Sequence, residues 1–181
     1  YTADRMGPVE LASCAFGQSS KISYLEMAAA VCAVVNGGKL MQPYLVSDIL
    51  APDGTVLEHR DPVCKQQVIQ PETSAVVLYG GGRNAQISGY RVGGKSGTSQ
   101  KLDSADEKAR IASFVAVAPI DDPQFLCLVC LDEPHSWTTA GGSLSAPVCA
   151  EVLEQTLVYK GVPRAAADVP AEQTAALPAD G

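Results

Sequence analysis

The hydrophobic and polar positions in the first third of the chain predict one well-defined helix. Residues 24–35 are rich in Ala, Met, Leu and Val, and Ser23 stands three residues before Glu26, which is the spacing of a capping box. The run Asn36-Gly37-Gly38 follows and predicts a left-handed end to the helix. Because apolar residues lie nearly all round this helix, we expect it to be buried.

The residues after this helix predict a β-hairpin and then a short second helix. Residues 44–50 and 55–57 have the composition of strands, and Pro52-Asp53-Gly54 between them is typical of a turn. Pro71 occupies the favoured first position of a helix. This helix runs to about Tyr79, where three consecutive glycines follow.

The second half of the chain predicts strands and one long helix. Residues 91–100, 111–118 and 124–131 favour strands, and residues 143–160 favour a helix. Residues 111–118 and 124–131 are nearly continuous apolar runs, so we expect two central strands that are covered on both faces. The order of elements therefore predicts an α+β fold, with an antiparallel sheet packed against helices.

The end of the chain has a different composition. Residues 162–181 hold seven Ala and three Pro and show no periodic apolar face, which predicts a disordered tail. We therefore expect residues 1–161 to form the folded part. Tyr1 is not a natural start, so we also expect the sequence to begin at an internal boundary.

Charge and hydropathy exclude some classes of function. The formal net charge is -7 and no cluster of Lys and Arg occurs, which argues against nucleic-acid binding. No apolar run reaches the roughly 18 residues of a membrane span. The sequence therefore predicts an acidic globular domain.

The six cysteines do not form a recognisable metal motif. Cys127 and Cys130 make a C-x-x-C within an apolar run, but side chains three apart in a strand point to opposite faces. No second Cys or His pair has zinc spacing. We therefore expect no metal site, and we interpret the cysteines as small residues of the core.

The segment Lys95-Ser96-Gly97-Thr98 in the first strand of the meander is the candidate for chemistry. Lys95 supplies a cation, Ser96 and Thr98 supply hydroxyl donors, and Gly97 lets a ligand approach the backbone. On an edge strand these groups suit an anionic peptide end and an oxyanion. The pattern argues against a phosphate-binding loop, because such a loop stands between a strand and a helix, whereas the residues after Lys95-Ser96-Gly97 favour a strand.

The order of these segments resembles the transpeptidase domain of class B penicillin-binding proteins over about residues 7–163. No single segment is specific, but their common order across the whole chain is. The overall pattern is most similar to elongation- and sporulation-type members from Gram-positive bacteria. The matching segments are Gly7–Gln18, Val35–Leu40 with Gln42-Pro43-Tyr44, Tyr90–Lys101, Ser113–Pro119 with Asp121–Pro123, and Gly141-Gly142 with Ala146-Pro147.

The resemblance implies a β-lactamase/transpeptidase-like serine acyltransferase that cross-links peptidoglycan stem peptides and is acylated by β-lactam antibiotics. By the same resemblance, Lys95 sets the electrostatics of the site, and the hydroxyls of Ser96 and Thr98, with Gly97 between them, bind the substrate carboxylate. The Thr98 backbone N–H would supply half of the oxyanion hole. Neither a metal nor an organic cofactor is implied.

The sequence departs from the family in two places. Its enzymes carry S-x-x-K, S-D-N and K-T-G motifs, and here no Ser has Lys three positions later or Asn two positions later. We therefore expect the chain to begin after these motifs, to be inactive alone, and to need the missing N-terminal half of the domain as a partner. At residues 79–84 the family has about ten more residues. This difference bears on the packing against one side of the sheet and not on the K-S-G-T strand itself.

Other interpretations stay open at this stage. A non-catalytic penicillin-recognising sensor, or a binding module of a cell-wall complex, would use the same fold without the nucleophile. An unrelated α+β structural domain is the third alternative. If the chain is part of a peptidoglycan transpeptidase, we expect an extracytoplasmic parent protein anchored in the bacterial membrane, with elongasome, divisome or spore-cortex proteins as further partners.

Overall fold

A computed structural model of the chain describes residues 5–15, 17, 21–78, 85–101 and 104–164. Most of the predicted tail, residues 165–181, and the short segment 79–84 lie outside the described residues, so the boundary at 161 stays a prediction. The elements are α1 (Pro8–Ala15), α2 (Tyr24–Val35), β1 (Lys39–Met41), β2 (Asp48–Leu50), β3 (Val56–His59), β4 (Cys64–Gln67), α3 (Pro71–Leu78), β5 (Gly93–Gln100), β6 (Arg110–Ala118), β7 (Phe125–Asp132) and α4 (Gly141–Tyr159).

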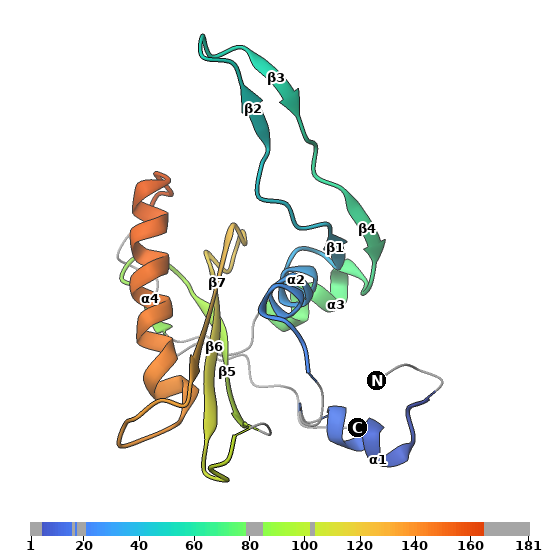
Figure 1. The fold of residues 1–181 in the computed structure, drawn as a ribbon. Coiled ribbons are helices and arrows are strands. Elements are labelled where there is room, and N and C mark those ends of the chain that lie inside the picture. The colour runs from blue at the N-terminus through green and yellow to red at the C-terminus, as the bar shows by residue number, and fades with distance from the viewer. Residues whose placement is uncertain (1–4, 16, 18–20, 79–84, 102–103, 165–181) are drawn as a thin grey trace.

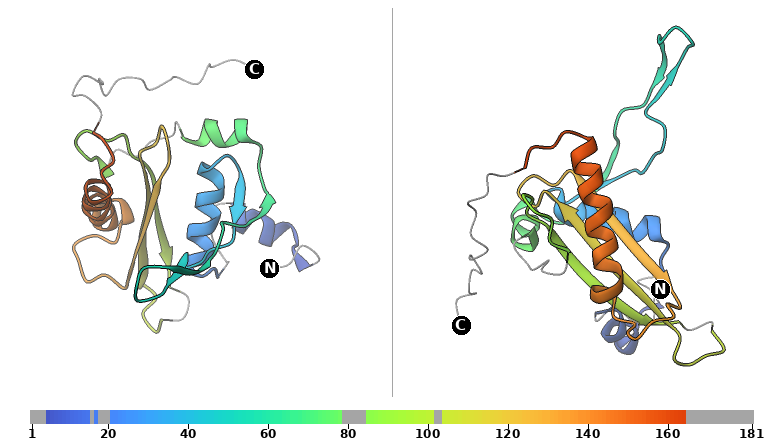
Figure 2. Two further views of the ribbon diagram at one scale, coloured as in Figure 1. Left: turned by 90° about the horizontal axis from the view of Figure 1, so that it is seen from above. Right: turned by 90° about the vertical axis from the view of Figure 1, so that its left-hand side faces the viewer.

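Residues 85–164 form a sheet covered by a helix, which we call the sheet–helix unit. Strands β5, β6 and β7 make an antiparallel sheet in that order, and α4 lies along one face of it (Figures 1 and 2). The predicted meander, closing helix and α+β class are therefore confirmed. Consecutive strands are neighbours here because the turns that join them are short.

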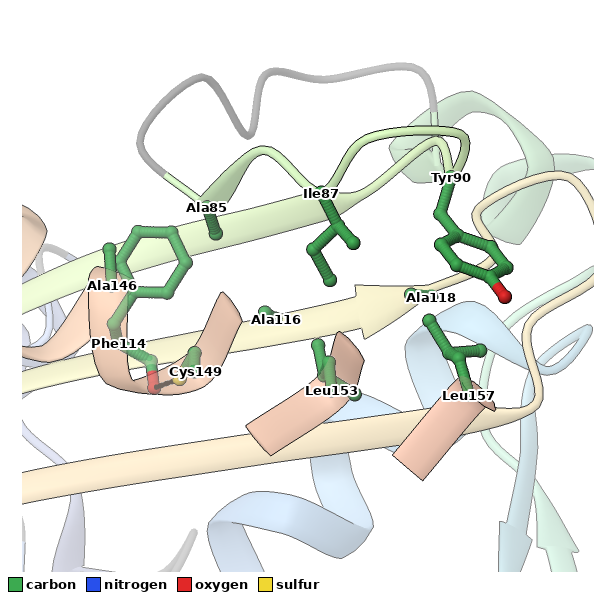
Figure 3. Packing of buried hydrophobic residues seen from close by; sticks show 10 residues of the cluster. All are labelled: Ala85, Ile87, Tyr90, Phe114, Ala116, Ala118, Ala146, Cys149, Leu153 and Leu157. Atoms are coloured by element: carbon green, nitrogen blue, oxygen red, sulfur yellow. Dashed lines mark hydrogen bonds between the residues drawn. The ribbon is translucent and has the colours of Figure 1, made fainter. Parts of the chain in front are cut away.

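The main core lies between α4 and this sheet (Figure 3). Apolar residues at helical spacing on α4 meet alternate residues of β6, since side chains of a strand point to opposite faces. Two polar groups are satisfied in the same layer: the Ser145 hydroxyl donates to the Ala112 carbonyl at 2.9 Å, and the Cys149 thiol to the Phe114 carbonyl at 3.3 Å. The fully or nearly buried members are Ala85, Ile87, Tyr90, Phe114, Ala116, Ala118, Ala146, Cys149, Leu153 and Leu157.

The chain beyond α4 is attached to this core. The Tyr90 hydroxyl donates to the Val162 carbonyl at 2.7 Å, and Arg164 pairs with Glu154 at 2.7 Å. The Arg164 guanidinium also lies over the Tyr90 ring. The first residues of the predicted tail are thus packed on the sheet–helix unit.

The prediction of two central strands is right for β6 and wrong for β7. In the described part of the chain, β7 pairs with β6 alone and is an edge strand. Its residues are mostly half-buried rather than buried. An apolar run predicts a buried strand, but it does not show which chain segment supplies the second neighbour.

Residues 5–78 form an N-terminal lobe, in which α2 starts and ends as predicted. Ser23 accepts a hydrogen bond from the Glu26 N–H at 3.2 Å, and the Glu26 carboxylate accepts one from the Ser23 N–H at 3.0 Å. The capping box lowers the pKa of Glu26, chiefly through the Ser23 hydroxyl. After α2, Gly37 adopts a left-handed φ of 83°.

The expected burial of α2 is wrong for this chain. Ala33 is its only buried residue, and Tyr24 and Leu25 are 60% and 63% exposed. Helix α2 contacts β1, α3 and β7, and these elements cover one side of it. The other apolar side of α2 has no cover among the described residues.

A buried serine fastens α3 to the end of α2. The Ser74 hydroxyl donates to the Val34 carbonyl at 2.5 Å and accepts from the Gly37 N–H at 3.0 Å. The adjacent Gly38 has φ 90°, and a Cβ there would overlap the Ile69 carbonyl. This junction sets the direction in which the chain leaves α2.

Residues 39–67 form a long two-stranded arm that reaches away from the rest of the molecule (Figure 1), the hairpin arm. Its base pairs β1 with β4, two strands that the sequence pattern did not predict, and its outer part pairs β2 with β3 around the predicted turn. Every residue of β2 and β3 is exposed. The hairpin arm is therefore held by backbone pairing and surface contacts rather than by a core.

A cluster of charged side chains joins β2 to β3 in the outer part of the hairpin arm. His59 Nδ1 lies 2.6 Å from Asp48 Oδ1, and His59 Nε2 lies 3.3 Å from Asp61 Oδ1. Hydrogen bonding with Asp48 raises the pKa of His59, and the same bond lowers the pKa of Asp48. The imidazole thus holds β2 and β3 together most strongly when it is charged.

The cysteines divide between core and surface. Cys149 is buried as expected, but Cys64 on β4 is exposed, so the interpretation of all six as core residues is wrong. Cys127 packs against the α4 core, and its carbonyl lies 3.6 Å from the Cys149 thiol. The described residues hold no cluster of three or more side chains that could bind a metal.

Candidate functional site

The K-S-G-T segment lies in the middle of β5, as the sequence predicted. Lys95 stands opposite Val115, Ser96 opposite Phe114 and Thr98 opposite Ala112 in the ladder with β6. Within the described residues β5 has no partner strand on its other side. The segment therefore borders an open sheet edge.

The backbone of this edge has a defined orientation. The Gly97 carbonyl faces β6, because it accepts a hydrogen bond from the Ser113 hydroxyl at 3.3 Å. In an antiparallel ladder the N–H and C=O of successive residues point alternately toward the partner and away from it. The N–H and C=O groups of Ser96 and Thr98 consequently point to the open edge.

The side chains of the segment converge on the same edge from both faces. Ser96 and Thr98 share the face that α4 covers, and Lys95 lies on the opposite face. The Lys95 Nζ nevertheless reaches round the edge and donates to the Ser96 carbonyl at 2.7 Å. All three side chains are exposed, so one cation and two hydroxyls are available to a ligand along one edge of β5.

The glycines of β5 leave room for side chains of β6. A Cβ on Gly97 would lie 2.6 Å from the Ser113 hydroxyl, and one on Gly94 would lie 2.6 Å from the Phe114 ring. The Ser113 hydroxyl fills the space beside Gly97 on this face, and the approach of a ligand to the Gly97 backbone stays a prediction. The glycines thus let β5 lie close against the side chains of β6.

Helix α4 begins against the site. The N–H of Gly141 donates to the Thr98 hydroxyl oxygen at 3.2 Å, across 43 residues of sequence. Gly141 is buried, and a Cβ there would overlap the carbonyl oxygens of Ser113 and Gly97. Sequence reasoning noted Gly141 only as the start of the closing helix and missed this contact.

A salt bridge fixes the far end of β5. The Lys101 Nζ lies 2.9 Å from Glu133 and 3.0 Å from Asp132, which follow and end β7. The hydrogen bonds that Lys101 donates to these carboxylates raise the pKa of Lys101 and lower the pKa of Glu133. The two outer strands of the sheet are therefore tied across β6 at this end.

Neither histidine is part of the β5 site. His59 belongs to the hairpin arm, and His135 is an exposed residue of the loop between β7 and α4. None of the described helices is long and apolar enough to cross a membrane.

The fold and this strand define a class of protein. The family described as penicillin binding protein transpeptidase domain matches residues 2–154 of the chain, and the chain belongs to that family. The β-lactamase/transpeptidase-like fold and the resemblance to the penicillin-binding protein transpeptidase family are thereby confirmed.

Individual relatives agree with this assignment. Stage V sporulation protein D of Bacillus subtilis is 39% identical over 173 residues, which cover 90% of this chain and 27% of that protein. The chain therefore spans about a quarter of the length of this relative. The similarity supports the sporulation-type resemblance seen in the sequence.

Solved structures show the same fold. The transpeptidase domain of penicillin-binding protein 3 from Burkholderia pseudomallei has a TM-score of 0.70 at 29% identity, over 92% of this chain and 50% of that one. The ceftriaxone acyl-enzyme of penicillin-binding protein A from M. tuberculosis has a TM-score of 0.73 at 24% identity, over 83% of this chain and 37% of that one. In both structures, the solved chain is longer than the part of it that this chain matches.

Proposed function

We propose that the chain supplies the K-S-G-T wall of the active site of a peptidoglycan D,D-transpeptidase. The observation that carries this proposal is the open edge of β5, where Lys95, Ser96 and Thr98 are exposed and the Thr98 N–H points outward. Lys95 would hold the electrostatics of the site. The Ser96 and Thr98 hydroxyls, with Gly97 between them, would bind the carboxylate of a stem peptide or a β-lactam.

The nucleophile of this reaction would come from outside the chain. No S-x-x-K or S-x-N stands in the sequence, so residues that precede it in a longer protein would supply the serine, its lysine and the second motif. The acyl bond would form between that serine and the donor carbonyl. The Thr98 N–H would then stabilise the oxyanion together with the N–H of the serine itself.

Covalent labelling tests this division of labour. This chain alone should give no covalent adduct with a fluorescent penicillin, as read by intact mass. The longer protein with the preceding part of the domain should label stoichiometrically. A stoichiometric adduct on the chain alone would show that a serine within it is reactive and would refute the proposal.

The contribution of the wall is tested in the longer protein. Thr98→Val should lower the rate constant of penicillin acylation by about tenfold, the scale of one hydrogen bond to a charged group. Lys95→Ala should lower it by about 10²-fold, the scale of losing one electrostatic stabilising group. Lys65→Ala, which removes an exposed lysine from β4 of the hairpin arm, is the matched control and should leave the rate unchanged. Complete absence of labelling in the longer protein would instead favour a non-catalytic sensor.

The uncovered side of α2 is a second consequence of the proposal. The preceding part of the domain would cover Tyr24 and Leu25, so the chain alone should self-associate through them. Sedimentation velocity should show association that Leu25→Lys reduces. The control Val152→Lys changes a residue of α4 that is 46% exposed and should have no such effect. A monomeric wild-type chain with one cooperative unfolding transition would contradict this.

The setting of the proposed enzyme follows from its substrate. Peptidoglycan is assembled outside the cytoplasmic membrane, so we place the parent protein there and expect a membrane anchor elsewhere in it. Elongasome, divisome or spore-cortex proteins are the partner classes that fit this location.

A further inference from the structure

The first residue of α4 has room for glycine only. A Cβ on Gly141 would overlap the carbonyl oxygens of Ser113 and Gly97 and would lie 2.8 Å from the Ser113 nitrogen. These are backbone atoms of two paired strands, so they cannot turn aside as a flexible side chain could. Glycine at this position therefore brings the start of α4 into direct contact with β5 and β6.

This contact uses one acceptor position of the Thr98 hydroxyl oxygen. The first N–H groups of a helix have no partner within the helix, and the Gly141 N–H donates to Thr98 Oγ1 at 3.2 Å. A hydroxyl carries one proton and two acceptor lone pairs. Because Gly141 uses one lone pair, the Thr98 proton must be donated in another direction.

The remaining direction leads to the open edge of β5. Thr98 is exposed there, and the Lys95 ammonium has come round to the same edge. An anion at this edge accepts the Thr98 proton and is stabilised by Lys95 and by the positive end of the α4 dipole. The hydroxyl of Ser96, by contrast, has no hydrogen-bond partner among the described residues.

We propose that Gly141 is a positioning residue, whose backbone N–H orients the Thr98 hydroxyl as a donor to the substrate carboxylate. The inference rests on the proposed function, in which this edge binds that carboxylate. It assigns unequal roles to two similar groups, because the oriented Thr98 hydroxyl binds without the entropy loss that ordering Ser96 requires. Gly141 itself touches no substrate.

The test compares two ligands that differ only in the carboxylate, a penicillin and its methyl ester, acylating the longer protein. In wild type the acid should react faster than the ester. Gly141→Ala should lower the ratio of the two rate constants by about tenfold, the scale of one hydrogen bond to a charged group. Thr98→Val should lower the ratio equally. Thr98→Ser should keep it, and so should Ser143→Ala, an exposed change in the same turn of α4.

Two outcomes separate this inference from the function on which it rests. If Thr98→Val lowers the ratio and a folded Gly141→Ala does not, the positioning role is refuted and the carboxylate site stands. If Gly141→Ala lowers both rate constants equally, its role is structural and the inference is again refuted. If Lys95→Ala and Thr98→Val leave the ratio unchanged, the carboxylate site itself is wrong.

A second measurement on this chain covers the case in which Gly141→Ala does not fold. The Gly141 amide should exchange with solvent about tenfold faster in Thr98→Val than in wild type, because its acceptor is lost. Thr98→Ser retains the acceptor and should restore slow exchange. Equal exchange in the Val and Ser variants would refute the hydrogen bond on which the inference depends.

Discussion

The sheet–helix unit and the N-terminal lobe bury similar apolar residues to very different degrees. In the former, Leu153 and Leu157 of α4 are 2% and 0% exposed, whereas Leu25 of α2 is 63% exposed. Both helices are apolar, and both have well-formed ends. The difference lies in what covers them: α4 rests on a three-stranded sheet, and α2 has cover on one side.

This comparison shows which part of the chain is stable by itself. A helix gains most of its stability from the packing of its apolar face rather than from its own propensity. The sheet–helix unit contains both layers of its core, so it can fold from its own residues. The N-terminal lobe depends on local devices such as the Ser23 cap, the buried Ser74 and the glycines after α2.

The largest expected effect tests the core of the sheet–helix unit. Leu157→Ala leaves a cavity where α4 meets the sheet and should lower the free energy of unfolding by about 2–5 kcal/mol. Leu25→Ala removes the same atoms from an exposed site and should change it by less than about 0.5 kcal/mol. Urea unfolding followed by circular dichroism measures both. A loss of similar size in the two variants would mean that the lobes share one core.

Val158→Ala is the internal control for this pair. Val158 is the residue after Leu157 on α4 but is 56% exposed, so its truncation should be nearly neutral. A large loss in Val158→Ala would show that helix propensity or an unrecognised contact, rather than burial, determines the stability of α4.

A medium effect is expected at the junction that follows α2. Gly37 and Gly38 both have positive φ, so an alanine at either costs about 1–2 kcal/mol of backbone strain. Nothing lies within 4 Å of a Cβ on Gly37, whereas one on Gly38 would overlap the Ile69 backbone. Gly38→Ala should therefore destabilise the N-terminal lobe clearly more than Gly37→Ala, as measured by amide hydrogen exchange in α2 and α3. Equal losses would mean that the loop between β4 and α3, which holds Ile69, yields freely.

The smallest effect is expected in the hairpin arm and depends on pH. The folded pKa of His59 is raised above its ordinary value of about 6.5. Its contribution to stability is thus fully present below that value and lost as the pH rises through the folded pKa. The lowered pKa of Asp48 has the opposite sign, so its contribution is lost only in acid, below the ordinary carboxyl range.

Nuclear magnetic resonance can follow this cluster directly. As the pH rises above about 6.5, contacts between β2 and β3 should weaken while the sheet–helix unit stays unchanged. Asp48→Asn should lower the midpoint of the His59 titration and remove most of the pH dependence. The cluster would have no role in pairing β2 with β3 if that variant titrated like wild type.

The sequence predicted most of the sheet–helix unit because its signals are local. Strands β5 to β7 are separated by turn residues, and α4 begins with a glycine pair, so each element is marked by local sequence signals. The Ser23–Glu26 box and the Asn36-Gly37-Gly38 stop were predicted for the same reason. Strands β1 and β4 were missed because three or four residues carry too little periodicity.

The wrong predictions concern which segments cover an element, not the local structure of that element. An apolar pattern shows that α2 and β7 favour burial, but not which segment provides the neighbour. The same limit applies to the site: the K-S-G-T string could be placed on a strand, whereas the bond from Gly141 to Thr98 joins residues 43 apart and has no sequence signature. The closure of Gly97 by Ser113 is equally non-local.

The order of the strands has a consequence for how the chain folds. In the sheet–helix unit every strand pairs with the next one along the sequence, and α4 packs back onto all three. Strands that are close in sequence pair after a short loop has closed, which costs little conformational entropy. Such topologies therefore fold quickly. A protein synthesised from its N-terminus would thus complete its K-S-G-T edge rapidly, once α4 has left the ribosome.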